Sequence, residues 1–327
     1  MRIFLTIFLI ALTVTLVGTP WIRRLAVSFG FVDAPAQRKM HSTPMPLLGG
    51  VAIWGGALIG LLVFSSQMPD SVVGVAAAIA VIGLVGLIDD RFGLPAWVKL
   101  AGQFAAFVVL ALYDIRVQTP LPELVDYAIT FVWLTGITNA INFLDNMDGL
   151  SAGVSGVAAA FILLLGSQNG QFLVAALAAA VLGSCLGFLR FNFKPAQIFM
   201  GDAGSLFLGF VLALLGLQLR FPENVTFVTW MVPVFVLGLP IFDMSLVVFS
   251  RLRRGVSPNT AGKDHTSHRL VDLGFSQREA VLILYLACGA LGMVAVFITQ
   301  ASVVEGYMIG GAVTAVALYL ILWLDKK

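Results

Sequence analysis

The chain carries few charges for its size. Only 11% of its 327 residues are Asp, Glu, Lys or Arg, whereas soluble globular domains carry about 25%. Hydrophobic residues make up 59% of the sequence, and its mean hydropathy is +0.99. A water-soluble core cannot bury that much apolar surface, which excludes soluble, disordered and nucleic-acid-binding proteins. The composition therefore predicts a polytopic protein of the lipid bilayer that binds no nucleic acid.

Cysteine is also scarce, and the charges nearly balance. Cys185 and Cys288 both lie in apolar runs, so they predict small buried core residues rather than a disulfide or a metal site. The formal net charge of +2 is too small to indicate an acidic partner. The placement of the charges is therefore more informative than their sum.

Apolar runs of about 20 residues, the length that crosses a bilayer, recur along the whole chain. We expect an all-α fold with about eleven transmembrane helices, ten being the alternative, in a single transmembrane transferase domain over residues 1–327. The expected spans lie near residues 3–22, 47–66, 71–88, 95–113, 124–140, 150–167, 171–190, 204–220, 226–249, 279–299 and 303–324.

The basic residues fall on one side of this arrangement. If the N-terminus lies outside and the spans alternate, sixteen of the 19 Lys and Arg residues are cytoplasmic, and only Arg2, Arg116 and Arg220 are not. The three histidines and the longest loops lie on the same side. We therefore expect a multi-pass protein of the cell (inner or plasma) membrane, with a cytoplasmic C-terminus and its chemistry at the cytoplasmic face.

Two adjacent acids, Asp89 and Asp90, end the third expected span. At a helix C-terminus they repel each other and face the negative end of the helix dipole. A cation should compensate them, and the candidates are Arg91, Lys99 or a bound divalent metal. Alternatively, the two acids are simply solvated in a tight loop and have no functional role.

Polar residues also recur every third position from Asn139 through Asn142 and Asp145 to Asp148. Carboxylate and amide oxygens are hard ligands that suit Mg²⁺ rather than zinc. Asp202, flanked by glycines before the eighth span, stands where a helix begins. It could be an ordinary helix cap, or a place where a metal and a phosphate meet free amides.

Cations for phosphate binding come from two cytoplasmic segments. The loop at 251–278 contains Arg253, Lys263, His265, His268 and Arg269. Arginines beside a membrane can be topology signals alone, but the His-x-x-His spacing favours anion binding. The first loop adds Lys39 and His41 in a Pro/Gly-shaped connector. Sites of phosphoryl transfer combine acids that bind Mg²⁺ with cations that bind phosphates.

These motifs resemble those of the polyprenyl-phosphate N-acetylhexosamine-1-phosphate transferases (glycosyltransferase family 4), particularly the branch that begins glycans with GlcNAc 1-phosphate. The resemblance runs from about residue 33 to residue 278. The matching segments are Arg38-Lys39-Met-His41 with Gly49-Gly50, Asp89-Asp90, Asn139 to Leu150, Phe199 to Ser205, and Asp264 to Leu270. Two positions depart from the pattern, because Ser267 stands where that branch often has histidine and Leu47 where a basic residue is common.

The resemblance implies a reaction in which undecaprenyl or another polyprenyl phosphate attacks a UDP-N-acetylhexosamine and releases UMP, beginning a cell-envelope glycan such as O-antigen lipopolysaccharide or teichoic acid. GlcNAc is the expected sugar. The resemblance also implies Mg²⁺, or Mn²⁺, on Asn142 and Asp202, with catalytic roles for Asp89, Asp90, Asp145, His265 and His268. Substrate binding would fall to Lys39, His41, Asp148, Asn192, Phe199, Arg253, Lys263 and Arg269.

Other functions stay open at this point. A phospho-MurNAc-pentapeptide transferase of peptidoglycan synthesis would use the same chemistry, and a homodimer is compatible with the sequence. A secondary transporter should place ionisable residues near mid-span, and Asp243 after Pro240 is the main residue that fits. A purely structural scaffold would leave the polar cytoplasmic loops unexplained.

Overall fold

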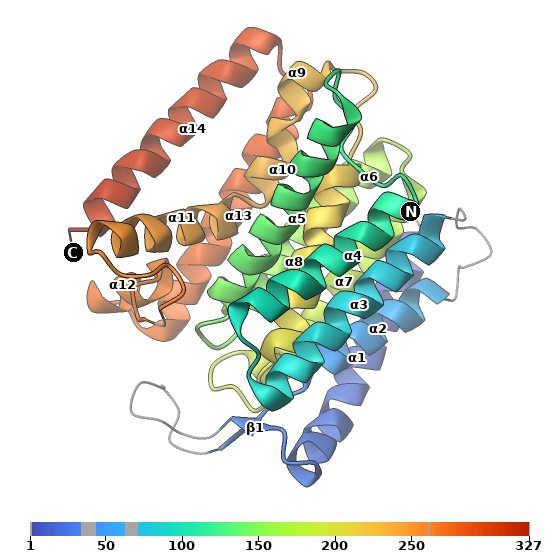
Figure 1. Ribbon diagram of the computed structural model, residues 1–327, viewed down its shortest axis with the longest axis vertical. Helices are drawn as coiled ribbons and strands as arrows, with labels where there is room; N and C mark the ends of the chain where they lie inside the picture. The colour runs from blue at the N-terminus through green and yellow to red at the C-terminus, as the bar shows by residue number, and fades with distance from the viewer. Residues whose placement is uncertain (1, 34–43, 63–70, 261, 327) are drawn as a thin grey trace.

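The computed structural model describes residues 2–33, 44–62, 71–260 and 262–326. The chain is a bundle of helices, as predicted (Figure 1). A two-stranded antiparallel sheet, not predicted, pairs β1 with β2 through Val32↔Pro46 and Asp33↔Met45. The elements are α1 (Arg2–Ser28), β1 (Val32–Asp33), β2 (Met45–Pro46), α2 (Gly49–Leu62), α3 (Ser71–Phe92), α4 (Ala96–Leu112), α5 (Glu123–Leu144), α6 (Leu150–Gln168), α7 (Phe172–Asn192), α8 (Gly201–Gln218), α9 (Thr226–Thr229), α10 (Met231–Val236), α11 (Gly238–Arg253), α12 (Thr266–Asp272), α13 (Gln277–Ile298) and α14 (Val303–Leu324).

Each of the eleven expected spans overlaps at least one of these helices. Within the described residues, eight helices are long and apolar enough to cross a membrane, and α9 to α11 add a ninth if they form one bent span. The apolar helices α2 and α4 are shorter. The chain is thus a multi-pass helical membrane protein, and the count of eleven spans stays a prediction.

Helix α8 lies at the centre of the bundle. It is apolar on every side, which is the pattern of a helix surrounded by protein, and nearly all of it is buried. Small residues let its neighbours approach closely. A Cβ on Gly209 would lie 2.7 Å from Cα of Thr138 on α5, and one on Gly50 of α2 would lie 2.1 Å from the amide of Gly204. Helices α2, α3 and α5 therefore pack directly around α8.

The ninth expected span, near 226–249, is not straight. Residues Thr226–Val236 and Gly238–Arg253 meet at an angle of 72°. Pro240 lies in the first turn of α11 and has no N–H to donate to the preceding turn, so the hydrogen-bond ladder is interrupted there. As a result α11 runs across the bundle, whereas α10 runs along it (Figure 1).

Candidate active site

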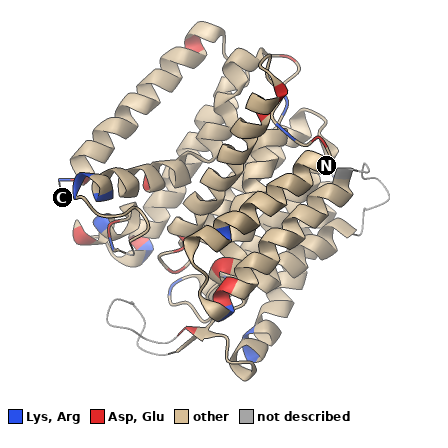
Figure 2. Cartoon of the chain, in the orientation of Figure 1, with Lys and Arg blue, Asp and Glu red and all other residues tan. Residues whose placement is uncertain are grey.

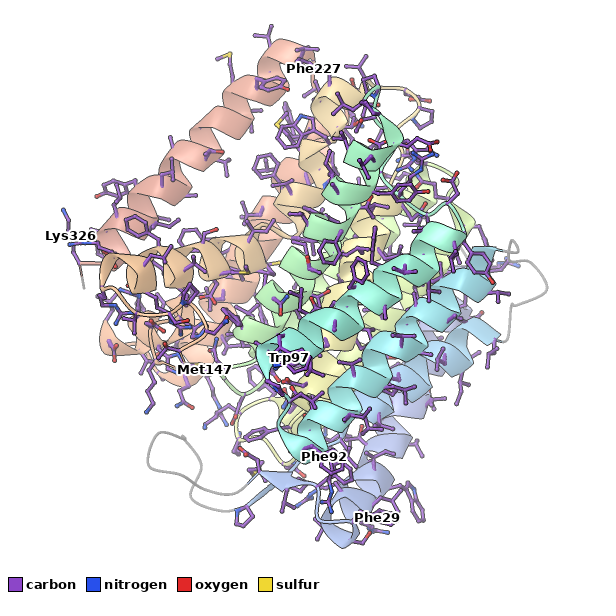
Figure 3. All side chains as sticks on the ribbon, in the orientation of Figure 1. Phe29, Phe92, Trp97, Met147, Phe227 and Lys326 are labelled. Carbon is purple, nitrogen blue, oxygen red and sulfur yellow. The ribbon has the colours of Figure 1, made fainter. Side chains whose placement is uncertain are left out.

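Charged side chains gather where the helix ends and connecting loops meet (Figure 2). The C-termini of α3, α5 and α7 meet the N-termini of α4, α6 and α8 at this end of the bundle. Figure 3 shows Trp97 from the start of α4 and Met147 from the α5–α6 loop at this end, whereas Phe227 lies at the opposite end. The site is therefore built from helix ends, where backbone groups and short loops supply polar atoms inside an apolar chain.

Asp90 joins the end of α3 to the start of α8. Its Oδ1 accepts a hydrogen bond from the amide of Asp202 (2.7 Å), and its Oδ2 accepts one from the amide of Ala203 (3.0 Å). The negative charge lies against the positive end of the α8 dipole, which offsets its unfavourable place at the end of α3. The first amides of α8 therefore bind a carboxylate of the chain itself, rather than being free for a phosphate.

Lys99 is the cation that compensates the acids. Its Nζ lies 2.9 Å from Oδ2 of Asp89 and 2.8 Å from Oδ2 of Asp202, so one ammonium group bridges the two carboxylates. Arg91, the other protein candidate, donates instead to the carbonyls of Phe29 and Gly30. The sequence identified Lys99 as a counter-charge but not as a residue at the centre of the site.

Asn142, at the end of α5, belongs to the same group. Its Nδ2 donates to Oδ1 of Asp202 and to Oγ of Ser205, each at 2.9 Å. Asp145 follows one residue after α5. Burial and the neighbouring carboxylates of Asp202 and Asp90 raise its pKa to about 8. An added cation would relieve this concentration of negative charge.

The residues present fit a magnesium ion. Asp89 and Asp202 already converge on one positive charge, and Asn142 adds an amide at the same carboxylate. Among the described residues, no group of three His, Cys, Asp or Glu side chains could hold a metal alone. Mg²⁺ does not need such a cage, since it commonly binds one or two carboxylates together with water and substrate phosphates.

A second cluster lies beside the first, in the α7–α8 connection. Oδ2 of Asp148 accepts a hydrogen bond from the amide of Ala196 (3.0 Å) and lies 3.2 Å from Nζ of Lys194. Asn192 accepts a hydrogen bond from the amide of Gly149 at 3.0 Å. Two predicted binding residues, Asp148 and Asn192, thus tie the α5–α6 loop to the α7–α8 connection.

Phe199 also comes from the α7–α8 connection, and its backbone binds the segment before α2. Its amide donates to the carbonyl of Pro46 (2.9 Å), and its carbonyl accepts from the amide of Gly49 (3.0 Å). The predicted Gly49-Gly50 motif is therefore docked against the start of α8. Lys39 and His41, from the same predicted loop, lie outside the described residues.

Helix α12 brings the histidines to the site. His265 stacks edge-on against Phe143, the neighbour of Asn142, with ring centroids 6.2 Å apart, and it lies 6.0 Å from the His268 ring. Oγ of Ser267 donates to Oδ1 of Asn146 at 2.6 Å, which fastens α12 to the α5–α6 loop. Burial and the nearby His265 and Lys263 charges lower the pKa of His268.

The basic residues of this loop occupy different positions. Arg269 is buried, and it donates to the Asp264 carbonyl (2.9 Å) and to Oγ of Ser250 (2.9 Å). Arg253 pairs with Asp325 after α14. Lys263 is exposed at the start of the segment that leads to His265. The structure thus places the two histidines and Asn146 together, whereas Arg253 and Arg269 hold the loop and the C-terminal helix.

Known proteins with similar sequences are named as enzymes that catalyse the same type of transfer reaction. The family model for glycosyl transferase family 4 matches residues 72–220. A probable undecaprenyl-phosphate N-acetylglucosaminyl 1-phosphate transferase of Bacillus subtilis is 34% identical over 308 residues, which are 90% of this chain and 85% of the relative. The chain belongs to glycosyl transferase family 4.

Other members of glycosyl transferase family 4 agree with this assignment. The decaprenyl-phosphate N-acetylglucosaminephosphotransferase of Mycolicibacterium smegmatis is 34% identical over 86% of this chain and 79% of its own length. An undecaprenyl-phosphate alpha-N-acetylglucosaminyl 1-phosphate transferase of Escherichia coli K12 is 27% identical over 84% and 78%. The chain is therefore an enzyme, and neither the transporter nor the pentapeptide-transferase alternative is favoured.

Gly201 gives a direct test of the Asp90 contact. Its φ is +70°, and a Cβ there would lie 2.4 Å from Oδ2 of Asp90. We expect Gly201→Ala to lower the free energy of unfolding by about 3 kcal/mol, because it adds displacement of Asp90 to the left-handed backbone cost. Gly93→Ala is the matched control, since Gly93 has φ +64° and open space around it. Equal losses in detergent unfolding of the two variants would contradict this role of Asp90.

The ion pairs of Asp264 hold the segment that leads to His265, and they can be tested through their dependence on pH. Burial raises its pKa, but hydrogen bonds and charge from Arg251 and Arg254 outweigh burial and lower it to about 2. Its contribution to stability is therefore present above its ordinary pKa of 3.8 and is lost as the pH falls towards 2. We expect Asp264→Asn to lower the free energy of unfolding by about 2 kcal/mol at neutral pH. The difference from wild type should shrink below about pH 4, and a difference independent of pH would refute the ion pairing.

Proposed function

We propose that the enzyme transfers GlcNAc 1-phosphate from UDP-GlcNAc to a polyprenyl phosphate, undecaprenyl phosphate in bacteria, and releases UMP. The observation that carries the proposal is the convergence of Asp89 and Asp202 on one cation position, with Asn142 hydrogen-bonded to Asp202. This position lies beside Asp148 of the α5–α6 loop, which is expected to bind substrate, and beside the histidines of α12. The sugar and the lipid are taken from the names of the relatives.

The reaction joins two anions, so neutralising charge is the main task of the site. An oxygen of the acceptor phosphate attacks the β-phosphorus of the donor, the bond from that phosphorus to the bridging oxygen breaks, and UMP leaves with that oxygen. Mg²⁺, or Mn²⁺, held by Asp202 and Asn142 would neutralise diphosphate charge and orient its oxygens. His265 and His268 donate N–H groups to phosphate oxygens when protonated.

Each carboxylate of the site has a different task in this proposal. Asp90 fixes the start of α8, and so it sets the position of Asp202. Asp89 holds Lys99, whose ammonium group would be able to pair with a substrate phosphate if a bound metal ion neutralised the carboxylates. Asp145, whose pKa is raised to about 8, holds a proton beside them at neutral pH.

A groove in the bundle suits the lipid acceptor. A cavity of about 880 Å³ lies between α5 and α11 and is lined almost entirely by apolar side chains. Val132, Gly136 and Ala140 line it on α5, towards the end that bears Asn142. A polyprenyl chain in this groove would lead its phosphate towards Asn142, while the uracil would stack on Phe199 and hydrogen-bond Asp148.

In this proposal the site faces the cytoplasm, with the N-terminus outside and the C-terminus inside. The excess of basic residues at the end of the bundle that carries the site supports this orientation. A donor nucleotide made in the cytoplasm would then reach Asp148 and Phe199 directly from water. The mid-helix acid Asp243, which suggested a transporter, binds His265 in the folded protein instead.

The activity test is direct. Purified enzyme with Mg²⁺ should release UMP from UDP-GlcNAc only when polyprenyl phosphate is added, and mass spectrometry should find polyprenyl-diphosphate-GlcNAc. We expect Asp202→Asn or Asn142→Ala to lower kcat by at least about 100-fold, because diphosphate charge is no longer neutralised. Removal of divalent metal with EDTA should have the same effect. Full activity of both variants would refute the proposed metal ligands.

Filling the groove should affect only the lipid substrate. A Cβ on Gly136 would meet no atom within 4 Å, so Gly136→Leu should fold normally and reduce the cavity. We expect the KM for polyprenyl phosphate to rise roughly tenfold, since about 1.4 kcal/mol of lipid contact is lost. The KM for UDP-GlcNAc should stay unchanged. Gly289→Leu on α13, also with open space around it, is the control, and equal effects of the two variants would argue against this groove.

A further inference from the structure

The buried acid of α11 is bound by the segment that begins α12. Asp243 is fully buried, and its Oδ2 lies 2.8 Å from Nδ1 of His265. Its Oδ1 accepts a hydrogen bond from the amide of Thr266 at 2.7 Å. One carboxylate thus binds both the ring of His265 and the backbone beside it, so the ring cannot turn without breaking a buried hydrogen bond.

Helix α11 places this acid between the groove and the histidines. Its buried face carries Asp243, Val247 and Ser250 at helical spacing. The other face carries Met244 and Val248, which line the apolar groove. Neighbouring positions of one helix therefore contact the proposed lipid site and the histidine segment, and the 72° bend before α11 brings both to the end of α5.

The contact also decides which nitrogen of His265 is available. The carboxylate accepts a hydrogen bond from Nδ1–H, which leaves Nε2 as the nitrogen on the side of the ring away from Asp243. The ring lies against Phe143, the neighbour of Asn142, so it is held close to the proposed metal position. A histidine oriented by a buried carboxylate is a recurring arrangement in catalysis.

We propose that Asp243 is a positioning residue, which fixes the orientation of His265 and holds a proton on Nδ1, so that the protonated ring donates Nε2–H to a phosphate oxygen of the reacting substrates. The inference rests on the proposed function, because it assigns a task to Asp243 within that reaction. It also explains why an acid is buried in the middle of a membrane-embedded helix, where an unpaired charge would be very costly.

The test replaces the acid with its amide. In Asp243→Asn the side-chain oxygen can still accept from Thr266, but the amide group donates to Nδ1, so the ring is left neutral and no longer presents a positive charge to the phosphate. We expect kcat for UMP release to fall on the order of 100-fold, with the KM for UDP-GlcNAc within about threefold of wild type. The detergent melting temperature should change little. Asp272→Asn, an exposed acid on α12, is the matched control and should keep wild-type kcat.

A double-mutant cycle separates positioning from a structural role. If Asp243 acts through His265, then Asp243→Asn should cause no further loss of kcat in a His265→Ala background. Losses that multiply would overturn the inference, and so would wild-type kcat in Asp243→Asn alone.

Two further outcomes have clear meanings. If Asp243→Asn does not fold, His265→Gln replaces it, because Gln keeps an N–H for Asp243 but offers no second ring nitrogen. A folded His265→Gln with wild-type kcat would overturn the inference. A wild-type enzyme that releases no UMP would instead overturn the proposed function, and this inference with it.

Discussion

The hydrogen bonds from the first amides of α8 to Asp90 determine the geometry of the whole site. They join the C-terminal end of one apolar helix to the N-terminal end of another, and the dipole of α8 stabilises a charge that the dipole of α3 opposes. Gly201 leaves the space that this carboxylate needs. With α3 and α8 fixed in this way, Asp89 and Asp202 face each other across a gap that one cation spans.

Much of this arrangement could be predicted from local signals. Long apolar runs located a helix in each of the eleven expected segments, and motifs such as Asp89-Asp90 and Gly201-Asp202 marked helix ends. The family resemblance is confirmed by relatives that cover most of the chain. These predictions succeeded because hydrophobic length and helix-end chemistry are properties of short segments. The span count, the single domain, the orientation, the metal and the roles of the individual site residues, Lys39 and His41 among them, stay predictions.

The rest depends on contacts between distant segments. Nothing near Lys99 distinguishes it from an ordinary cytoplasmic charge, and Arg91 is nearer to the acids in sequence. Only the packing of α4 against α3, near the start of α8, brings the Lys99 ammonium group between two carboxylates. Asp243 resembled a transporter residue because its partner, His265, lies 22 residues away across a bend that hydropathy does not reveal. Ser267 departs from the usual histidine, and its bond to Asn146 likewise needs the folded chain.

The two faces of α11 have a consequence for how the enzyme can be blocked. The face with Met244 and Val248 opens to an apolar groove, whereas the α5–α6 and α7–α8 loops meet where charged side chains gather. Compounds of opposite character can therefore reach the same reaction centre from different phases: a polar nucleotide analogue from solution and an amphiphile from the bilayer. Because the two would occupy separate volumes, a single molecule that linked them would combine both binding free energies in one inhibitor.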